Sequence, residues 1–195
     1  MALVASAASI AITLAACGSH TGAPVASSPS VAPVATSVTE PATGCPTAAP
    51  TGAGTPEWTL AGATGNVAVT GSTDTAAPYV KVDAPFSVTD TQVHTLRAGT
   101  GPVVADTATV SVCYMGVDGR DGAVFDSSYQ RGTPAEFPLT RVVPGFQKAI
   151  AGQKVGSTVA VAMASADGYP DGQPSAGIQK GDTLVFAIKI LDVTG

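Results

Sequence analysis

Residues 122–145, GAVFDSSYQRGTPAEFPLTRVVPG, combine aromatic and aliphatic side chains with the carboxylate of Asp126 and the guanidinium of Arg131. Glycine and proline stand where this stretch must turn rather than inside its apolar runs. The stretch holds no nucleophile with a matching base, no cluster of metal ligands and no glycine-rich phosphate loop. The pattern predicts an apolar pocket whose chemistry depends on shape and on removal of water, without a metal or a cofactor.

The segment before this stretch is predicted to be one of the strands that support the pocket. Residues 109–115 alternate between two faces, with Val110, Val112 and Tyr114 directed toward the core and Cys113 directed away from it,. Turn residues separate the apolar runs, which indicates an antiparallel meander. Other strands are predicted at residues 91–96, 123–126, 135–139, 157–163 and 183–191,.

One helix is predicted to pack against these strands. Pro144 suits its first position, Gly152 suits the position just after its end, and Phe146 and Ile150 share one face,. The sequence therefore predicts an α+β fold, in which an antiparallel sheet of five to six strands curls around one short helix.

Composition divides the chain into a leader and a domain. All nine Lys and Arg residues lie from Lys81 onward, and the earlier part is rich in Ala, Thr, Ser, Gly and Pro. The net charge of -5 and the lack of a basic cluster in the sequence argue against nucleic acid as the main partner, because phosphate binding requires clustered cations,. Residues 58–90 are expected to form an irregular, β-like lead-in that packs onto the domain through Trp58, Val80 and Phe86.

The first residues predict export and a lipid anchor. Residues 1–16 are apolar and too short to span a membrane, which is typical of a signal peptide,. They lead into Leu14-Ala15-Ala16-Cys17, which resembles the lipobox of bacterial lipoproteins and predicts lipid attachment at Cys17 on the outer face of the cell membrane. The alternative is a hydrophobic stretch with an incidental cysteine. No basic residue precedes Cys17, so we expect the start of translation to lie further upstream. Residues 17–57 are predicted to be a disordered tether.

Two further cysteines, Cys45 and Cys113, would lie in an oxidising compartment if the chain is exported,. One prediction is a disulfide between them that holds the leader to the domain. The other is a pair of free thiols, because spacing along a sequence does not establish proximity.

The motifs of residues 91–195 together resemble FKBP-type peptidyl-prolyl cis-trans isomerases. The resemblance rests on ordered blocks that cover the whole predicted domain. These blocks are Tyr114-Met115-Gly116, Val124-Phe125-Asp126-Ser127-Ser128, Arg131-Gly132, Phe137-Pro138-Leu139, Val142-Val143-Pro144-Gly145-Phe146, Lys154-Val155-Gly156 and Thr183-Leu184-Val185-Phe186.

The resemblance implies a proline-binding pocket with Phe146 as its floor. The Tyr169 hydroxyl and the Val143 backbone N–H would donate to substrate carbonyls, and Arg131 would pair behind the wall with Asp126 or Tyr114. The implied catalytic residues are Tyr114, Phe125, Asp126, Phe146, Tyr169 and Phe186, and the implied substrate-binding residues are Val142, Val143, Ile178 and Arg131.

The implied function is isomerisation of X-Pro bonds in exported proteins by a monomer, with macrolides such as rapamycin as further ligands. The sequence departs from the family pattern at Ala135, where relatives often carry an aromatic residue, and at Pro170, where glycine is common. Residues 167–180 are also polar and glycine-rich. These departures motivate an alternative, a non-catalytic chaperone or scaffold module that binds proline peptides.

Overall fold

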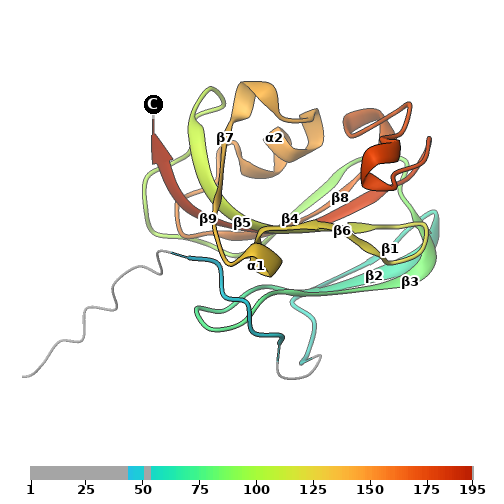
Figure 1. Cartoon of the computed structure of the whole chain (residues 1–195), viewed down its shortest axis with the longest axis horizontal. Helices are drawn as coiled ribbons and strands as arrows, with labels where there is room; N and C mark the ends of the chain where they lie inside the picture. Colours follow the sequence, from blue (N-terminus) through green and yellow to red (C-terminus); the bar gives the residue numbers. More distant parts are fainter. Residues whose placement is uncertain (1–43, 51–53, 195) are drawn as a thin grey trace, which may run out of the picture. The chain divides into compact units, whose positions relative to one another are not determined.

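The computed structural model describes residues 44–50 and 54–194 of the 195-residue chain. Its main sheet has the strand order β4–β8–β9–β5–β6, and β7 also pairs with β5 (Figure 1). All of these pairings are antiparallel, as predicted. The strands are β4 (Gln92–Arg97), β5 (Thr109–Asp118), β6 (Val124–Ser127), β7 (Ala135–Pro138), β8 (Thr158–Met163) and β9 (Leu184–Thr194).

Helix α2 (Pro144–Ile150) covers one face of this sheet, and its ends follow the sequence signals (Figure 1). Proline occupies the first turn, where its missing N–H costs nothing,. Gly152, just beyond the end, has a φ of 79°, a conformation that glycine adopts without strain,. The predicted α+β fold with one core helix is thus confirmed.

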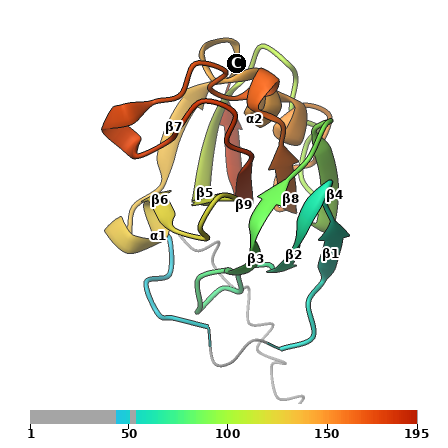
Figure 2. The ribbon, with the colours of Figure 1, turned by 90° about the vertical axis from the view of Figure 1, so that its right-hand side faces the viewer.

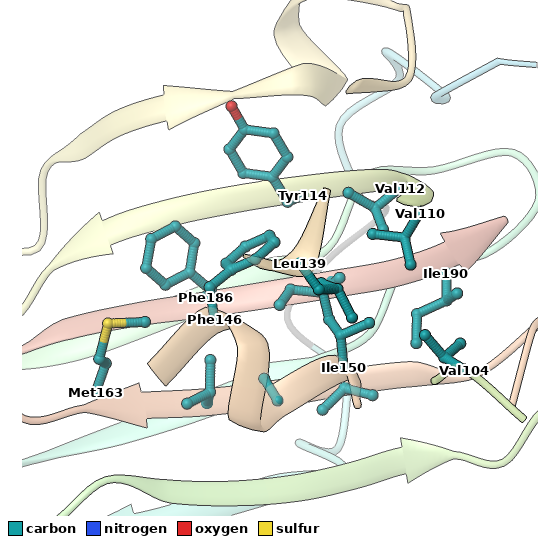
Figure 3. Packing of buried hydrophobic residues seen from close by; sticks show 14 of the residues in the cluster. Val104, Val110, Val112, Tyr114, Leu139, Phe146, Ile150, Met163, Phe186 and Ile190 are labelled. Carbon is teal, nitrogen blue, oxygen red and sulfur yellow. The ribbon is translucent and has the colours of Figure 1, made fainter. Parts of the chain in front are cut away.

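The main core lies between α2 and the sheet. Ile150 of α2 is fully buried beside Leu139 and the inward side chains of the strands (Figure 3). The predicted inward residues of β8 and β9 all belong to this core: Val159, Val161, Met163, Leu184, Phe186, Ile188 and Ile190. Short helical segments connect the strands: α1 (Ser128–Arg131), η1 (Leu139–Arg141), η2 (Ser165–Asp167) and η3 (Pro174–Ala176).

Residues 58–87 form a regular second sheet, so the lead-in is built of strands, as predicted, but it is not irregular. The sheet has the order β1–β2–β3, with β1 (Trp58–Ala61), β2 (Thr64–Thr70) and β3 (Tyr79–Ser87). It lies against the strands β4, β8 and β9 of the main sheet (Figure 2). Trp58, Val80 and Phe86 do contact the domain, as expected.

The second sheet buries the face of the main sheet that α2 does not cover. Val67, Val69 and Phe86 are at most 2% exposed. They pack against the side chains of β8 and β9 that point away from α2, namely Ala160, Ala162, Val185 and Ala187. Burying one large apolar side chain contributes about 1.5–3 kcal/mol, so this layer contributes to the stability of the domain.

Residues 44–50 also have a defined structure, which contradicts the predicted disorder of this part of the tether. Cys45 forms a disulfide with Cys113, with their Cα atoms 5.6 Å apart. The Ala77 N–H donates a hydrogen bond to the Ala48 carbonyl. The predicted disulfide is therefore present, and it joins residues 44–50 to β5.

The predicted signal peptide, lipid attachment at Cys17 and residues 17–43 of the tether lie outside the described residues. Within the described part of the chain, no helix has the length and apolar character needed to cross a membrane.

Candidate active site

A pocket of about 380 Å³ opens next to the first turn of α2. Strands β5, β6, β7 and β9 contribute to its wall, together with the η1–α2 segment and the loop after η2. The lining is mostly apolar, as the sequence predicts. The lining residues are Tyr114, Phe125, Asp126, Phe137, Arg141, Val142, Val143, Phe146, Tyr169 and Phe186.

Aromatic rings meet edge to face around Phe146 of α2 (Figure 3). The centroid of the Phe146 ring lies 5.4 Å from that of Phe186, 5.8 Å from that of Phe137 and 6.0 Å from that of Tyr114. The interplanar angles are 80°, 78° and 85°, close to the favoured perpendicular arrangement,. Each such pair adds about 0.5–1.5 kcal/mol beyond simple burial, so the rings support one another in a fixed wall.

Gly116 of β5 allows two of these rings to lie directly on the sheet. A Cβ atom at this position would stand 2.6 Å from Cζ of Phe125 and 2.8 Å from Cε1 of Phe186. Both distances are shorter than real carbon contacts, so a side chain here would displace a ring. The glycine of the Tyr114-Met115-Gly116 block thus has a steric role in the pocket.

Asp126, Tyr114 and Arg131 form one hydrogen-bonded group at the edge of the pocket. The Tyr114 hydroxyl donates to Asp126 Oδ2, and Arg131 donates to Asp126 Oδ1 at 2.5 Å. A second guanidinium nitrogen of Arg131 donates to the Tyr114 hydroxyl at 3.0 Å. Every strong polar group of this corner is therefore engaged within the protein.

This group moves two pKa values away from neutrality. Burial, reinforced by the hydrogen bond to Asp126, raises the pKa of Tyr114 to about 12. Burial would also raise the pKa of Asp126, but hydrogen bonds from Tyr114 and Arg131 and the charge of Arg131 outweigh it, and the pKa is lowered,. Asp126 remains a carboxylate and Tyr114 a neutral phenol at neutral pH, so neither exchanges protons there.

Helix α1 places Arg131 next to its partners. The Ser127 hydroxyl caps the helix by accepting from the Gln130 N–H, and Gly132 ends it with a φ of 73°. The Ser128 hydroxyl accepts the Tyr114 N–H at 2.8 Å, which joins the start of α1 to β5. In the sequence Asp126-Ser127-Ser128, the first residue thus lines the pocket, the second caps α1, and the third joins α1 to β5.

Two donors at the pocket have no hydrogen-bond partner among the described residues. One is the N–H of Val143, the N-cap of α2, whose carbonyl accepts the helical N–H groups of Phe146 and Gln147. The other is the hydroxyl of Tyr169, a half-buried residue of the lining. Because both lie at the cavity, they are available to a bound carbonyl oxygen.

An ion cluster holds the loop that carries Tyr169. Arg120 donates to Asp118 at 3.2 Å, to Asp182 at 3.3 Å and to the Gly177 carbonyl at 3.2 Å. Burial, with the nearby Asp182 carboxylate, raises the pKa of Asp118. Through Arg120, the loop is thus held at the end of β5 by contacts at Gly177 and Asp182.

Known proteins that resemble this chain show to which family it belongs. The family model for FKBP-type peptidyl-prolyl cis-trans isomerases matches residues 101–191. An FK506-binding protein from Streptomyces anulatus is 35% identical over 107 residues, which cover 53% of this chain and 86% of the relative. The chain belongs to the FKBP-type peptidyl-prolyl cis-trans isomerase family.

Other members of the FKBP family match over a similar region. The FKBP-type 22 kDa peptidyl-prolyl cis-trans isomerase of Escherichia coli (strain K12) is 37% identical over 102 residues, which cover 52% of this chain. The chain spans about half the length of that curated relative, 49%. The N-terminal domain of FKBP42 from Arabidopsis thaliana matches with a TM-score of 0.51 at 15% identity, over 55% of this chain and 88% of that one, which shows the fold alone.

Most site residues inferred from the FKBP resemblance line the pocket, and two do not. Ile178 is 2% exposed and packs in the main core instead. Arg131 stays behind the wall, where it binds Asp126 and Tyr114 as the resemblance implies, and it is not part of the lining. Ala135, the departure from the FKBP pattern, is partly buried and is not part of the lining.

Phe137 and Arg141 line the pocket but were not among the predicted site residues. Phe137 had a signal, because its predicted strand directs it to the same face as Leu139. Arg141 directly precedes Val142 and Val143, two predicted wall residues. Its position next to these wall residues is the sequence signal that would have placed Arg141 at the pocket.

Proposed function

We propose that this protein catalyses cis-trans isomerisation of X-Pro peptide bonds. Rotation about such a bond has a barrier of about 18–20 kcal/mol, because amide resonance is lost as the bond twists. The twisted amide has less charge separation than the planar one and therefore loses less on transfer out of water. An apolar pocket favours the twisted state over the planar state, and this difference lowers the barrier.

The observation that carries the proposal is an aromatic cavity of about 380 Å³ whose free polar groups include two donors, the Val143 N–H and the Tyr169 hydroxyl. These donors would hold the carbonyl groups of a bound peptide, each contributing about 1 kcal/mol. Asp126 is neutralised by Arg131 and serves to orient the wall. The reaction requires no proton transfer, and the carboxylate that lines the pocket, Asp126, is paired with Tyr114 and Arg131.

A protease-coupled assay with the full chain and a proline-containing peptide tests this proposal. We expect the rate of cis-to-trans conversion to rise in proportion to protein concentration. Chemical-shift titration of the same peptide reports binding separately. If the peptide isomerises no faster in the presence of the protein, the proposal fails, whether or not the peptide binds.

Non-catalytic binding of proline peptides is the second candidate. Ala135 favours it, because relatives often carry an aromatic residue there, whereas the alanine side chain of this chain does not reach the pocket lining. Peptide binding with no change in isomerisation rate would decide for it. A titration with rapamycin under the same conditions measures whether the pocket also accepts a macrolide, which we propose as a further ligand.

We also propose that the protein is exported and attached to the outer face of the cell membrane through Cys17. The Leu14–Cys17 motif supports the anchor, and the Cys45–Cys113 disulfide supports an oxidising compartment,. Mass spectrometry of the mature N-terminus is expected to find a diacylglyceryl group on Cys17. Cys17→Ser is expected to move the protein from the membrane fraction to the soluble one, and an unmodified Cys17 would contradict the anchor.

We also propose that the protein without its lipid is a monomer. Analytical ultracentrifugation in the absence of detergent measures this.

A further inference from the structure

Two charged side chains, Asp126 and Arg141, line the pocket. Their situations differ, because Asp126 accepts hydrogen bonds from Tyr114 and Arg131 and its charge is compensated. Arg141 forms no ion pair and no side-chain hydrogen bond within the part of the chain that the structure describes. The pocket therefore has an uncompensated positive charge.

Arg141 holds this charge at a solvent-exposed position of the pocket lining. Arg141 ends η1, and the next two residues, Val142 and Val143, belong to the wall. Its side chain is exposed, whereas the wall valines are half-buried. A bound peptide whose carbonyl accepts the Val143 N–H would pass within reach of the guanidinium.

Other cations close to this part of the fold are already engaged. Lys148 of α2 contacts both oxygens of Asp167 at 2.8 Å. Arg120 is surrounded by Asp118, Asp121 and Asp182. Among the residues that the structure describes, Arg141 is thus the pocket-lining cation without an internal partner, and it is available to a substrate group.

We propose that Arg141 gives the pocket a preference for peptides with a carboxylate side chain, Asp or Glu, directly beside the proline. The inference rests on the proposed isomerase function and names the substrate class of that site. A guanidinium is suited to a carboxylate, since its parallel N–H groups match the two oxygens. The chain as a whole carries a net charge of -5, so the preference is local to Arg141 and does not come from long-range attraction,.

The test compares matched peptides that differ only in Glu or Gln next to the proline, on its N-terminal or its C-terminal side. The readout is the ratio of kcat/KM for the Glu peptide to that for the Gln peptide. An exposed ion pair corresponds to a ratio of about two to five at low ionic strength. We expect that ratio at one of the two positions, and we expect salt to lower it toward one.

Two Arg141 variants and a charge-matched control complete the test. Arg141→Gln is expected to bring the ratio to about one, and Arg141→Glu to bring it below one. Lys154→Gln removes the same charge from an exposed residue outside the pocket and is expected to leave the ratio unchanged. Equal ratios in the unaltered chain and in Arg141→Gln, or an equal fall in Lys154→Gln, would overturn the inference.

Failure of the inference remains distinct from failure of the proposed function. Acceleration of both peptides without a Glu preference overturns only the role of Arg141. If no peptide is accelerated, the dissociation constants of the Glu and Gln peptides, measured by chemical-shift titration, give the same ratio for binding. A binding ratio of one would then overturn the inference as well.

Discussion

At the scale of single residues, the two tyrosines of the pocket use their hydroxyl groups differently. The Tyr114 hydroxyl is satisfied internally by Asp126 and Arg131. The Tyr169 hydroxyl has no partner among the described residues. The first hydroxyl therefore belongs to the structure of the wall, and the second is available to the substrate.

Replacing each tyrosine by phenylalanine separates these roles. Tyr114→Phe is expected to lower the free energy of unfolding by about 1–2 kcal/mol, because two internal hydrogen bonds are lost. Tyr169→Phe is expected to leave that free energy within about 0.5 kcal/mol and to lower kcat/KM about fivefold, the equivalent of one hydrogen bond to substrate. Denaturant unfolding and isomerisation kinetics measure both, and a stability loss confined to Tyr169→Phe would contradict the assignment.

The lowered pKa of Asp126 has a consequence for stability in acid. A carboxylate whose pKa is lower in the folded than in the unfolded chain contributes stability above the unfolded value of about 3.9, and loses that contribution as pH falls through the folded value,. We expect Asp126→Asn to be less stable than the unaltered chain at neutral pH. The difference should shrink below about pH 4 in chemical denaturation, and a difference independent of pH would show that Asp126 is not held as a carboxylate by Tyr114 and Arg131.

At the scale of elements, β5 forms a platform for the rings of Phe125 and Phe186, and Gly116 is the point of contact. Gly116→Ala is expected to lower the free energy of unfolding by about 1–3 kcal/mol and to reduce isomerase activity, since a ring must move. Gly54→Ala is a matched control, because a Cβ there would meet no atom within 4 Å. Calorimetry and kinetics on both variants check the prediction, and equal effects of the two substitutions would contradict it.

The elements around α2 were largely predictable because each has a local signal. Pro144 and Gly152 mark the helix, and alternation marks Val110, Val112 and Tyr114 as core residues of β5. The regularity of the second sheet was not predicted, because Gly and Pro interrupt residues 58–87 and only short β-like runs stand out between them. Ala160, Ala162, Val185 and Ala187 make these strands apolar on both faces, a pattern typical of strands covered on both sides,.

The limits of prediction at the site have a similar physical cause. Ile178 and Tyr169 belong to the same polar loop, and periodicity does not define which side chain of an irregular loop faces a cavity. The structure places Tyr169 in the lining and Ile178 in the core. Arg141 carried no signal from residue type, because an exposed arginine is ordinary until its neighbours are known to form a pocket.

At the scale of the whole domain, two layers of contacts enclose the main sheet. The core under α2 includes the residues of the pocket, whereas the second sheet and the disulfide stabilise the opposite side. A chain of residues 91–195 alone would leave Ala160 and Val185 open to water. The unit that supports the pocket therefore includes residues 44–50 and the second sheet.

The disulfide joins cysteines 68 positions apart and lies in a separate cluster with Ala77 and Tyr129. Cys45→Ala combined with Cys113→Ala is expected to lower the free energy of unfolding by about 2–4 kcal/mol, because the unfolded chain gains freedom. Activity below the melting temperature is expected to stay within about twofold, since neither cysteine lines the pocket. Denaturant unfolding with parallel kinetics checks both, and loss of activity in a fully folded variant would contradict this separation of roles.

The pH dependence of catalysis tests most directly the claim that the pocket acts by shape and desolvation. Exchange NMR measures kcat/KM for an X-Pro peptide without a coupled protease, at each pH from 5 to 9. Tyr114 and Asp126 change protonation outside this window, with pKa values of about 12 and below the usual range of aspartate. We predict that the full chain accelerates exchange and that kcat/KM is flat across the window. A bell-shaped profile, which indicates an acid and a base, or exchange at the uncatalysed rate would contradict the claim.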